Sequence, residues 1–350
     1  MIVYSKSEGQ NNSKIGKLET PIKMIIEHES DLLSKAGGIA KSLFNIEKSS
    51  RFGETIIGGN EFDVFAATEE GGAAEADTLV ESYHKFIEHI QFMKEFIISA
   101  EMMEDANYGV AADAKRRAEN FTRAYYKTIN RICEAALVNA TAKSAVFARA
   151  ELDLTAPDGV ELFSSAHKLG VNGATQSNYY WGDILSSGDA NNRVVSTSLF
   201  EEALYELSIK MRNMKDENGE CLGYNADTLI LPGNRPALEA VARKVCGSKA
   251  TTGSDFNDIN LHYGAWDIVI LPNWQPTDNR IMIMSKEANK NLSGNMLFNR
   301  IPLTVTSWVD NHTGNYIWNG RCRFGVGFGS YKHIMLAVDS ASSVNGATKL

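Results

Sequence analysis

The sequence predicts an α+β protein, and three observations lead to this fold class. Residues 111–142 show helical periodicity with no proline or glycine among them. Before this stretch, residues 62–99 have the character of extended strands around an acidic turn. After it, short helical stretches and β-branched stretches follow one another, without an internal repeat or a low-complexity linker. This order predicts one long helix between an extended hairpin and a mixed domain.

Composition limits the classes of protein that the chain can represent. Its 350 residues are 43% hydrophobic and 22% charged, which is ordinary for one large or two smaller globular domains. Lys and Arg total 35 against 43 Asp and Glu, a net charge of −8. This balance argues against nucleic-acid binding by the whole chain. No stretch reaches the length of a signal peptide or a membrane span, so we expect a soluble protein made in the cytoplasm.

The four cysteines lie dozens of residues apart. They occupy positions 133, 221, 246 and 322, and no C-x-x-C pair occurs. This spacing indicates neither a zinc site nor a dithiol redox site. We expect four buried thiols.

The N-terminal region divides into an arm and a helix. The first 20 residues are polar and lack periodicity, which predicts an extended arm. Apolar residues then recur at helical spacing over 22–46. The pair Gly37-Gly38 interrupts them and predicts a break in the helix.

Two strands and an acidic turn predict a long hairpin. FDVFAAT (62–68) alternates as a strand does, and EEGGAAEAD (69–77) is an acidic turn. KFIEHIQFMKEFIIS (85–99) also fits a helical stripe, but its aromatic and β-branched residues favour a strand. A two-stranded hairpin cannot bury both of its faces within one chain. The sequence therefore predicts a partner for it.

The long helix has one apolar face and one basic face. At about 1.5 Å per residue it would be roughly 45 Å long. Off the apolar stripe, Lys115, Arg116, Arg117 and Arg123 form a basic cluster that we interpret as a solvated face, or as a contact for phosphate or an acidic protein surface. The apolar stripe consists of Ala114, Ala118, Phe121, Tyr125, Ile129, Ile132 and Ala136.

The second half alternates short helices and strands. Periodicity predicts helices over 198–214, with Ser198 as the N-cap, and over 235–245, with Pro236 near its first position. A turn segment spans 215–225. Predicted strands occupy 226–234, 266–274, 279–285, 302–309 and 323–338.

ELFSSAHKLG (161–170) contains the strongest candidate for catalysis. His167 follows Ser164 and Ser165, as a base could follow a nucleophile. No G-x-S-x-G motif occurs, and no acid is placed by the sequence to orient the histidine. We therefore expect the imidazole and both serine hydroxyls to bind loop backbone groups or to form a subunit contact.

The remaining motifs predict no metal and no cofactor. His28-Glu29 begins a zinc-helix pattern, but Leu32 stands where the second histidine belongs. His84 and His89 flank an apolar stretch without ligand spacing. GVGFG (325–329) has no following helix, so its glycines predict close packing of another backbone on a strand rather than a phosphate loop.

Four segments, taken in order, resemble the major capsid protein of tailed bacteriophages, a fold that encapsulin shells share. FMKEFIISAEMMEDANYG (92–109) resembles the passage from the extended loop (E-loop) into the spine helix. ELFSSAHKLG, with NYYWGDILSS (178–187) after it, resembles a Phe-Ser…His loop and its downstream Asn. Residues 215–245 resemble the Asp-Gly turn, strand and helix of the axial domain. RCRFGVGFGSYKHIMLAV (321–338) resembles the closing strand of the peripheral domain.

The resemblance covers roughly residues 60–345 and implies a structural protein that is no enzyme and needs no cofactor. Copies would form the pentamers and hexamers of an icosahedral shell around a phage genome. Implied partners are further copies, a portal, a scaffolding protein and packaged double-stranded DNA held by weak non-specific contact. The implied location is the virion capsid, assembled in the cytoplasm of a bacterial host. The implied regions are an N-terminal arm (1–50), an E-loop (51–98), a peripheral domain with the spine helix (99–222), an axial domain (223–310) and a return to the peripheral domain with the C-terminus (311–350).

Two departures from the family pattern sharpen these expectations. Some members cross-link through an E-loop lysine, but no lysine occurs from Phe52 to His84, so we expect a non-covalent shell. Only some 50 residues precede the E-loop, so we expect a separate scaffolding protein or none. The expected subunit contacts join the acidic tip to basic residues of a neighbour, and the candidates are Glu69, Glu70, Glu75 and Asp77 with Arg116, Arg117 and Arg123.

Two other interpretations stay open at this point. The first is the shell protein of an encapsulin-type compartment, which shares the fold. The second is a cytosolic hydrolase that uses His167.

Overall fold

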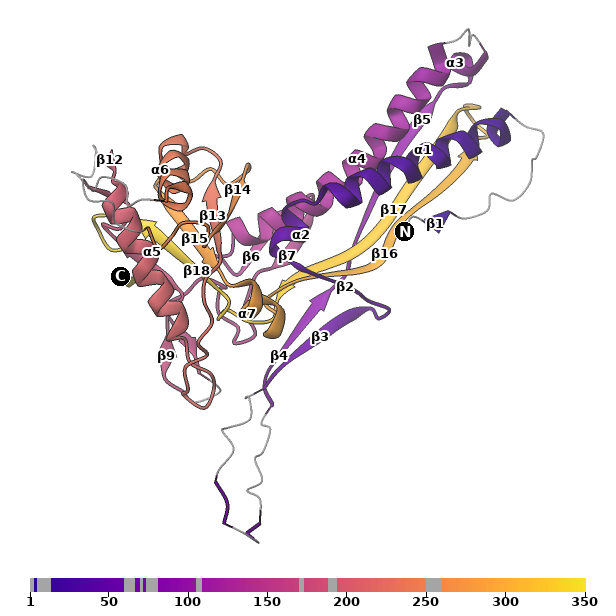
Figure 1. Ribbon diagram of the computed structural model, residues 1–350. Helices are drawn as coiled ribbons and strands as arrows, with labels where there is room; N and C mark the ends of the chain where they lie inside the picture. Colours follow the sequence, from indigo (N-terminus) through magenta and orange to yellow (C-terminus); the bar gives the residue numbers. More distant parts are fainter. Residues whose placement is uncertain are drawn as a thin grey trace.

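Strand pairing divides the chain into two main sheets that lie at different ends of the molecule (Figure 1). Helices α1 (Lys14–Ala36) and α4 (Gly109–Val138) accompany the first sheet, and α5 (Thr197–Arg212) and α6 (Pro236–Gly247) accompany the second. The structure is a computed structural model, and it describes residues 3–4, 14–59, 67–69, 72–73, 81–104, 109–169, 173–187, 194–249 and 260–350.

A long antiparallel ribbon forms the centre of the first sheet. Its strand order is β1-β16-β17-β5, and β2 adds to β16 in parallel. The register shifts twice near Pro302, where the strand loses a backbone donor. The strand is irregular at this point, and the sequence pattern predicted only its part after the irregularity, residues 302–309. The bounds are β1 (Val3–Tyr4), β2 (Asn45–Lys48), β5 (Ile90–Ile98), β16 (Asn295–Val309) and β17 (Tyr316–Phe328).

The N-terminal helix is longer than the sequence predicts. α1 already begins at Lys14, so the expectation of an extended arm is wrong for residues 14–20. The predicted break is confirmed, because Gly37 and Gly38 adopt φ values of 79° and 155° before α2 (Ile39–Leu43) starts. Ile22 and Ile26 bury the inner face of α1 beside α4.

The predicted long helix is confirmed as α4, which the short α3 (Ala100–Glu104) precedes. Its apolar stripe faces the first sheet, where Phe121 packs edge to face on Phe96 of β5 at 5.3 Å between ring centroids. Of the stripe, Tyr125 and Ile129 are half-buried and the other members are buried. No helix within the described residues combines the length and the apolar character needed to cross a membrane.

The second sheet is mixed and has its core strands buried on both sides. Its order is β14-β13-β15-β18-β10-β19, and β13 is buried along its whole length. The predicted strands of this region are confirmed, but 323–338 holds parts of two strands that belong to different sheets. The bounds are β10 (Tyr179–Gly182), β13 (Thr228–Pro232), β14 (Asp267–Leu271), β15 (Arg280–Met284), β18 (Ile334–Asp339) and β19 (Thr348–Lys349).

Helices α5 and α6 confirm the two predicted helices of the second half. Pro236 is the first residue of α6, as predicted. Ser198 as the N-cap of α5 is wrong, because the cap position is Ser196 and Ser198 lies inside the first turn. The Oγ atoms of these serines lie 3.0 Å apart, and neither caps the helix.

Several short elements have too few residues to show periodicity in the sequence. α7 (Lys286–Asn291) starts at Ser285, whose Oγ accepts a hydrogen bond from the Ala288 N–H at 3.3 Å. The remaining strands form small hairpins, namely β6 (Ser144–Phe147) with β7 (Ala150–Asp153), β8 (His167–Lys168) with β9 (Thr175–Gln176), and β11 (Ser186–Ser187) with β12 (Val194–Val195).

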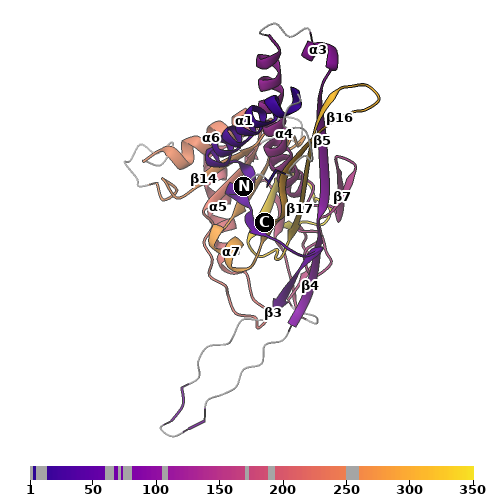
Figure 2. The same ribbon diagram turned by 90° about the vertical axis from the view of Figure 1, so that its right-hand side faces the viewer.

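A separate hairpin of β3 (Gly53–Gly59) and β4 (Glu81–Glu88) extends away from both sheets (Figures 1 and 2). The strand predicted over 85–99 is confirmed, since β4 continues into β5 with a break at His89. The strand predicted over 62–68 lies mostly outside the described residues. β4 pairs with 53–59 instead, a segment whose three glycines weaken the strand signal.

The sheets group the chain differently from the expected region boundaries. β16 precedes residue 310 but pairs along its length with β17, which follows it. β10 and α5 precede residue 222 but accompany the second sheet. Segments of each sheet therefore interleave along the sequence, and the division into peripheral and axial domains stays a proposal.

The cysteines differ in exposure. Cys133, Cys246 and Cys322 are buried, and burial raises the pKa of each thiol, in Cys246 to about 11. Cys221 is exposed, so the expectation of four buried thiols is wrong. Cys221 lies in the turn segment after α5, where no core is available to cover it.

His333 holds together the point where the chain passes from one sheet to the other. Its Nε2–H donates to Asn295 Oδ1 at 2.8 Å, and Asn295 Nδ2 donates to the Leu43 carbonyl at 2.9 Å. Asn295 begins β16 and His333 directly precedes β18. Burial lowers the pKa of His333 to about 3, so the ring is neutral at neutral pH.

Acid should weaken the fold through His333. The unfolded chain protonates this histidine near pH 6.5, while the folded chain resists protonation until about pH 3. The unfolded state therefore binds more protons between these values, and stability should fall by about 1.4 kcal/mol per pH unit as pH drops through this window. Urea unfolding from pH 8 to pH 4.5 measures this slope.

His333→Gln should show a shallower acid slope than the unmodified chain, although its stability at pH 8 is lower. His312→Gln is the matched control, since His312 is exposed. An unchanged slope in His333→Gln would contradict the assignment.

Candidate subunit-assembly site

The hairpin is fixed to the body by three inward side chains of the β4 region, Lys85, Ile87 and His89, which we call the hairpin clamp. All three are buried. Alternation along the strand directs Phe86 to the opposite face, where it is exposed. The clamp therefore separates a buried face of the hairpin from an exposed one.

Ile87 of the clamp crosses β17 where that strand has glycines. A Cβ on Gly325 would lie 2.7 Å from the Glu88 carbonyl oxygen, and one on Gly327 would lie 2.5 Å from Ile87 Cδ1. Ile87 then packs against Met296 and Phe298 of β16. The prediction that the GVGFG glycines allow close backbone packing is confirmed.

The buried Lys85 of the clamp forms an ion pair with Asp153, whose side chain is exposed, and its Nζ also donates to Thr155 Oγ1 at 2.6 Å. Burial alone would raise the pKa of Asp153, but the hydrogen bonds from Lys85 and Thr155 outweigh it and lower this pKa. Asp153 ends β7, so the bridge ties the hairpin to the β6–β7 hairpin. Neither partner was identified from the sequence, since 68 residues separate them.

His89 of the clamp links both hairpin strands. Its Nε2–H donates to Ser49 Oγ at 2.7 Å, and the Ser49 hydroxyl donates to Glu54 Oε1 of β3 at 2.6 Å. Burial and the Arg300 cation lower the pKa of His89, which favours the neutral ring. His89, interpreted from the sequence as a surface or hairpin residue, lies at the end of the hairpin and is buried.

The outward face of the hairpin continues into the face of the first sheet that points away from α4. Phe52 and Phe86 stack at 6.4 Å between centroids, and the Arg323 guanidinium lies 5.4 Å above the Phe52 ring. A row of apolar groups this long on a surface is typical of an interaction site. Its exposed members are Phe52, Ile57, Phe86, Met93, Ile97 and Trp308.

The predicted acidic and basic contact residues are only partly placed. Glu69 is exposed and its carbonyl accepts from the Gly72 N–H at 2.8 Å, while Glu70, Glu75 and Asp77 lie outside the described residues. The predicted basic residues already have partners within the chain, since Arg116 and Arg117 bind Asp113, and Arg123 binds Glu29 of α1 at 2.6 Å. These hydrogen bonds lower the pKa of Asp113.

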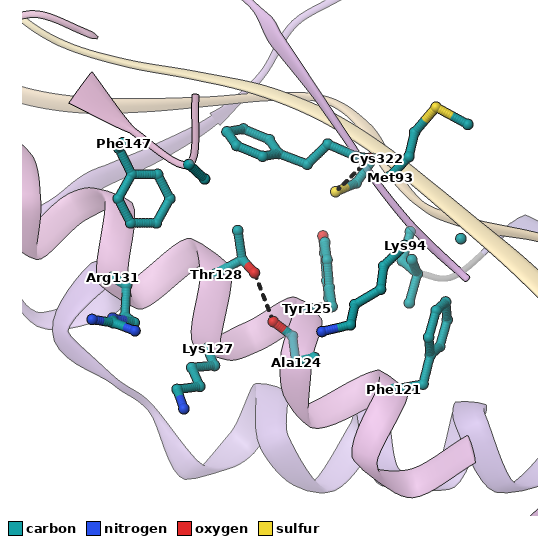
Figure 3. Close-up of a pocket in the computed structure, with 14 residues that line it drawn as sticks. Met93, Lys94, Phe121, Ala124, Tyr125, Lys127, Thr128, Arg131, Phe147 and Cys322 are labelled. Atoms are coloured by element: carbon teal, nitrogen blue, oxygen red, sulfur yellow. Dashed lines mark hydrogen bonds between the residues drawn. The ribbon is translucent and has the colours of Figure 1, made fainter. Parts of the chain in front are cut away.

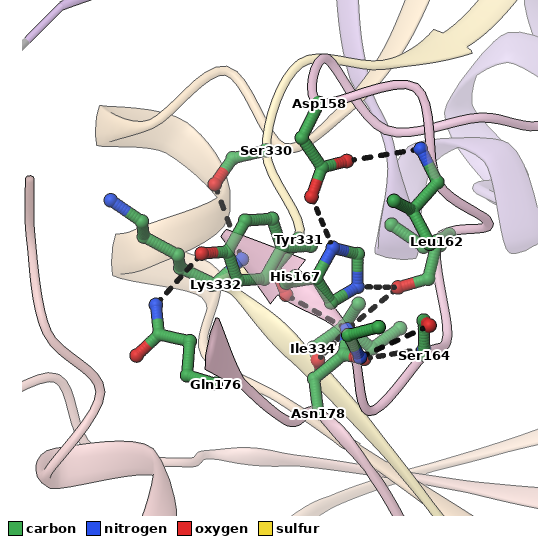
Figure 4. Close-up of polar contacts among 12 residues, drawn as sticks. Asp158, Leu162, Ser164, His167, Gln176, Asn178, Ser330, Tyr331, Lys332 and Ile334 are labelled. Carbon is green, nitrogen blue, oxygen red and sulfur yellow. Dashed lines mark hydrogen bonds and ion pairs between the residues drawn. The ribbon is translucent and has the colours of Figure 1, made fainter. Parts of the chain in front are cut away.

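The histidine loop is a buried polar network rather than a nucleophile site (Figure 4). His167 Nδ1 lies 2.7 Å from Asp158 Oδ2, and its Nε2 lies 3.1 Å from the Leu162 carbonyl oxygen. The ring stacks on Tyr331 at 3.8 Å. Both side chains of the pair are almost fully buried, at 0% and 1% exposure. Because both ring nitrogens are within hydrogen-bond distance of loop oxygens, neither is left to take a proton from a serine.

Asn178 closes the same loop with four hydrogen bonds. Its Nδ2 donates to the carbonyls of Leu162, Tyr331 and Ile334 at 2.7–3.2 Å, and its Oδ1 accepts from the Ser164 N–H at 3.0 Å. Two of these contacts reach Tyr331, in the turn before β18, and Ile334, the first residue of β18 (Figure 4). The loop therefore joins the region after α4 to the second sheet.

The two serines of the loop behave differently. Ser164 Oγ accepts from the Ala166 N–H at 3.3 Å, as predicted for a loop backbone contact. The backbone N–H of Ser165 donates to the Gly346 carbonyl at 3.0 Å. Among the described residues, no group of three or more His, Cys, Asp or Glu side chains is arranged to hold a metal ion.

Gly325→Ala should loosen the hairpin. The new Cβ would collide with the Glu88 carbonyl oxygen and His89 Nδ1, at 2.7 and 2.8 Å. Overpacking of this kind costs about 1–3 kcal/mol in the free energy of unfolding, which urea denaturation measures. Gly247→Ala is the matched control, since its Cβ meets no atom within 4 Å. Equal effects of the two substitutions would contradict the clamp.

His167→Ala should destabilise the chain by about 1–3 kcal/mol, because it leaves the buried Asp158 carboxylate without its hydrogen-bond partner on the ring. The double variant His167→Ala/Asp158→Ala should lose less than the sum of the two single variants. His28→Ala, at an exposed position of α1, is the control. Surface substitutions usually change the free energy of unfolding by about 0.5 kcal/mol or less. A loss in this range for His167→Ala would show that the pair is not structural.

Comparisons with known proteins agree with this architecture. Residues 91–335, more than two thirds of the chain, match the family described as phage capsid protein. Among curated proteins, none matches the chain significantly.

Solved structures with a similar fold have low sequence identity. The capsid structure of the Cyanophage P-SCSP1u is 12% identical, with a TM-score of 0.51 over 86% of this chain and 87% of that chain. A structure of Mycobacterium phage Patience is 15% identical, with a TM-score of 0.48 over 98% and 92%. The virus-like particle from Pyrococcus furiosus is 8% identical, with a TM-score of 0.47 over 90% and 98%. The family match over residues 91–335 shows that the chain belongs to the phage capsid protein family, and it is a structural subunit of a virion shell.

Proposed function

We propose that this chain is the major subunit of an icosahedral phage head, in which pentamers and hexamers hold together without covalent cross-links. The observation that carries the proposal is the hairpin clamp. It directs β3 and β4 away from the body (Figure 2), and their outward face carries the exposed side chains of Ile57 and Phe86. Self-association supplies the missing partner, since each subunit of a shell overlies a neighbour.

The burial and the hydrogen bonds of Lys85 support the proposal that the shell has no covalent cross-links. No lysine occurs from Phe52 to His84, and Lys85 is the first lysine after that stretch. Its ammonium is buried, at 5% exposure of the residue, and it is occupied by Asp153 and Thr155. An amine held in this way is not available to attack a neighbouring subunit.

The strand pairing supports an assignment of the regions of the fold. We assign the first sheet with α4 to the peripheral domain, the second sheet with α5 and α6 to the axial domain, and β3–β4 to the E-loop. The acidic tip residues Glu69, Glu70, Glu75 and Asp77 then contact basic side chains of a neighbour. Arg116, Arg117 and Arg123 can take part in this contact only if they release the carboxylates of their own chain that they now bind.

The proposed role as a head subunit implies further partners and a place of assembly. A portal, a separate scaffolding protein and packaged double-stranded DNA are the expected partners, with the DNA contacted weakly and without sequence preference. Assembly takes place in the cytoplasm of a bacterial host, and the chain catalyses no reaction. The use of both His167 nitrogens within the loop supports this last point against a hydrolase.

Negative-stain microscopy of the purified protein tests the proposal, and closed shells of uniform size are expected. In hot denaturing detergent these shells should release a single band at 38.5 kDa, the mass of one chain. Nuclease-protected DNA in particles from infected cells would separate a phage head from a compartment that encloses an enzyme. A small discrete oligomer, or a ladder of covalent multimers, would contradict the proposal.

Phe52→Ser/Phe86→Ser should abolish shells at concentrations where the unmodified chain assembles, because it removes the aromatic pair from the outward face of the hairpin. Phe52→Leu/Phe86→Leu is the matched control and should still assemble. The thermal unfolding of unassembled Phe52→Ser/Phe86→Ser should stay within a few degrees of that of the unmodified subunit. Normal shells from the serine variant would count against this surface.

A further inference from the structure

The two sheets carry surfaces of different kinds. Beside α4, β5 and the tip of the β6–β7 hairpin lies a groove of about 390 Å³, whose lining contains Lys94, Lys127 and Arg131 and no acidic residue (Figure 3). Lysine and arginine side chains keep their charge at any pH near neutrality, so this surface has one charge state. Histidine is the side chain whose charge changes in this range. His262, a buried histidine beside α5, therefore gives its surroundings two possible states.

A turn before β14 holds the C-terminal end of α6. It consists of residues 260–266, which we call the α6 turn. Asn260 Nδ2 donates to the Ser248 carbonyl at 2.8 Å, and the Gly264 N–H donates to the Cys246 carbonyl at 3.2 Å. The last carbonyls of a helix have no partner within it, and the α6 turn supplies donors to this end of α6.

His262 links the α6 turn to α5. Its side chain is buried, and its ring packs against Tyr205 of α5 with 4.3 Å between the ring centroids. The Trp266 Nε1–H donates to His262 Nδ1 at 3.1 Å. An indole nitrogen can only donate, so Nδ1 is the acceptor and the proton of the neutral ring is on Nε2. This contact therefore requires the neutral form of His262.

The imidazolium form of His262 does not fit the same arrangement. A proton on Nδ1 would point at the Trp266 N–H, so two donors would face each other. Nε2 is buried, and no acceptor lies within hydrogen-bond distance of it among the described residues. A buried charge without a hydrogen-bond partner is strongly unfavourable. Protonation therefore separates His262 from these neighbours.

The groups around the ring do not compensate for a positive charge on it. Burial lowers the pKa of His262 more than the Glu201 carbonyl of α5 raises it. The Glu201 carboxyl oxygen Oε1 is buried without a partner among the described residues, and burial raises the pKa of this group. Burial also raises the pKa of the Cys246 thiol of α6, to about 11, so this thiol is uncharged near neutral pH. Lys249, whose Nζ lies 5.9 Å from the centroid of the Tyr263 ring, has the same charge as an imidazolium.

We infer that the α6 turn is a pH-sensitive latch, which is closed on α5 while His262 is neutral and opens when the ring takes a proton. Because the pKa of His262 is lower in the folded chain than its ordinary value near 6.5, the stability that the latch adds is complete above about pH 6.5 and decreases as the pH falls below it. Leu261 and Tyr263 flank His262 in the turn, and both are exposed. The protonation of one buried ring thus controls the position of two apolar surface groups. The latch acts within one chain and does not depend on assembly.

Hydrogen exchange of the purified chain, followed by mass spectrometry from pH 7.5 to pH 5.5, tests the latch. After correction for the intrinsic exchange rate, the protection of the amides in 260–266 should fall by up to about tenfold for each pH unit below about pH 6.5. His262→Gln cannot take a proton in this range and should make this protection independent of pH, whatever its level. His262→Phe keeps a ring against Tyr205 and serves the same purpose if the glutamine variant does not fold.

His333→Gln is the matched control, because His333 is also a buried histidine but its hydrogen bond goes to Asn295 rather than to the α6 turn. This variant should keep the full pH dependence of the amides in 260–266. Protection that does not change with pH in the unmodified chain, or a pH dependence that persists in His262→Gln, would overturn the inference. Loss of the pH dependence in His333→Gln would assign the effect to global unfolding and would overturn the inference as well.

Discussion

The close crossing of Ile87 over the glycines of β17 is the contact on which the rest of the structure depends. Side chains at Gly325 and Gly327 would occupy the positions of the Glu88 carbonyl and of Ile87. Without this approach, Lys85 could not reach Asp153 and His89 could not reach Ser49. A hairpin of two strands is marginally stable by itself, so its direction is set by these buried contacts at its base.

The clamp also explains how one chain presents two different surfaces. Burying the inner face of β4 leaves the outer face apolar and exposed, and the long sheet extends that face past Met93 and Trp308. On the other side of the same sheet, α4 and β5 leave a basic groove at an open strand edge. A hairpin that lies over a neighbouring subunit, as proposed, forms a heterologous contact, which can be repeated around a ring of subunits. Repetition allows each contact to be small while the whole shell is stable.

The sequence predicted those parts of the fold that depend on local periodicity. The stripe of α4, the strand character of 85–99 and the helix after Pro236 each follow from residues within a few turns of one another. The clamp pairs were not predictable in this way. Lys85 and Asp153 lie 68 residues apart, and nothing near Asp153 distinguishes it from a surface carboxylate.

In the histidine loop, too, the sequence indicated the role of one residue but not its partner. ELFSSAHKLG indicated a polar structural role for His167, and the resemblance to a capsid loop pointed to the Asn that proved to be its neighbour. The partner Asp158 stands nine residues earlier in a Pro-Asp-Gly turn, where the sequence suggests only a turn residue. The short strands β8 and β9, the hairpin β6–β7 and the groove that it borders arise from tertiary packing, for which periodicity gives no signal.

A single-particle reconstruction of the assembled shell tests the central claim most directly. The account predicts that β3 and β4 of each subunit cross onto a neighbour, while Lys85 still meets Asp153 and His89 still meets Ser49 within the subunit. A reconstruction in which the hairpin folds back on its own subunit, or in which these clamp contacts are broken, would contradict it.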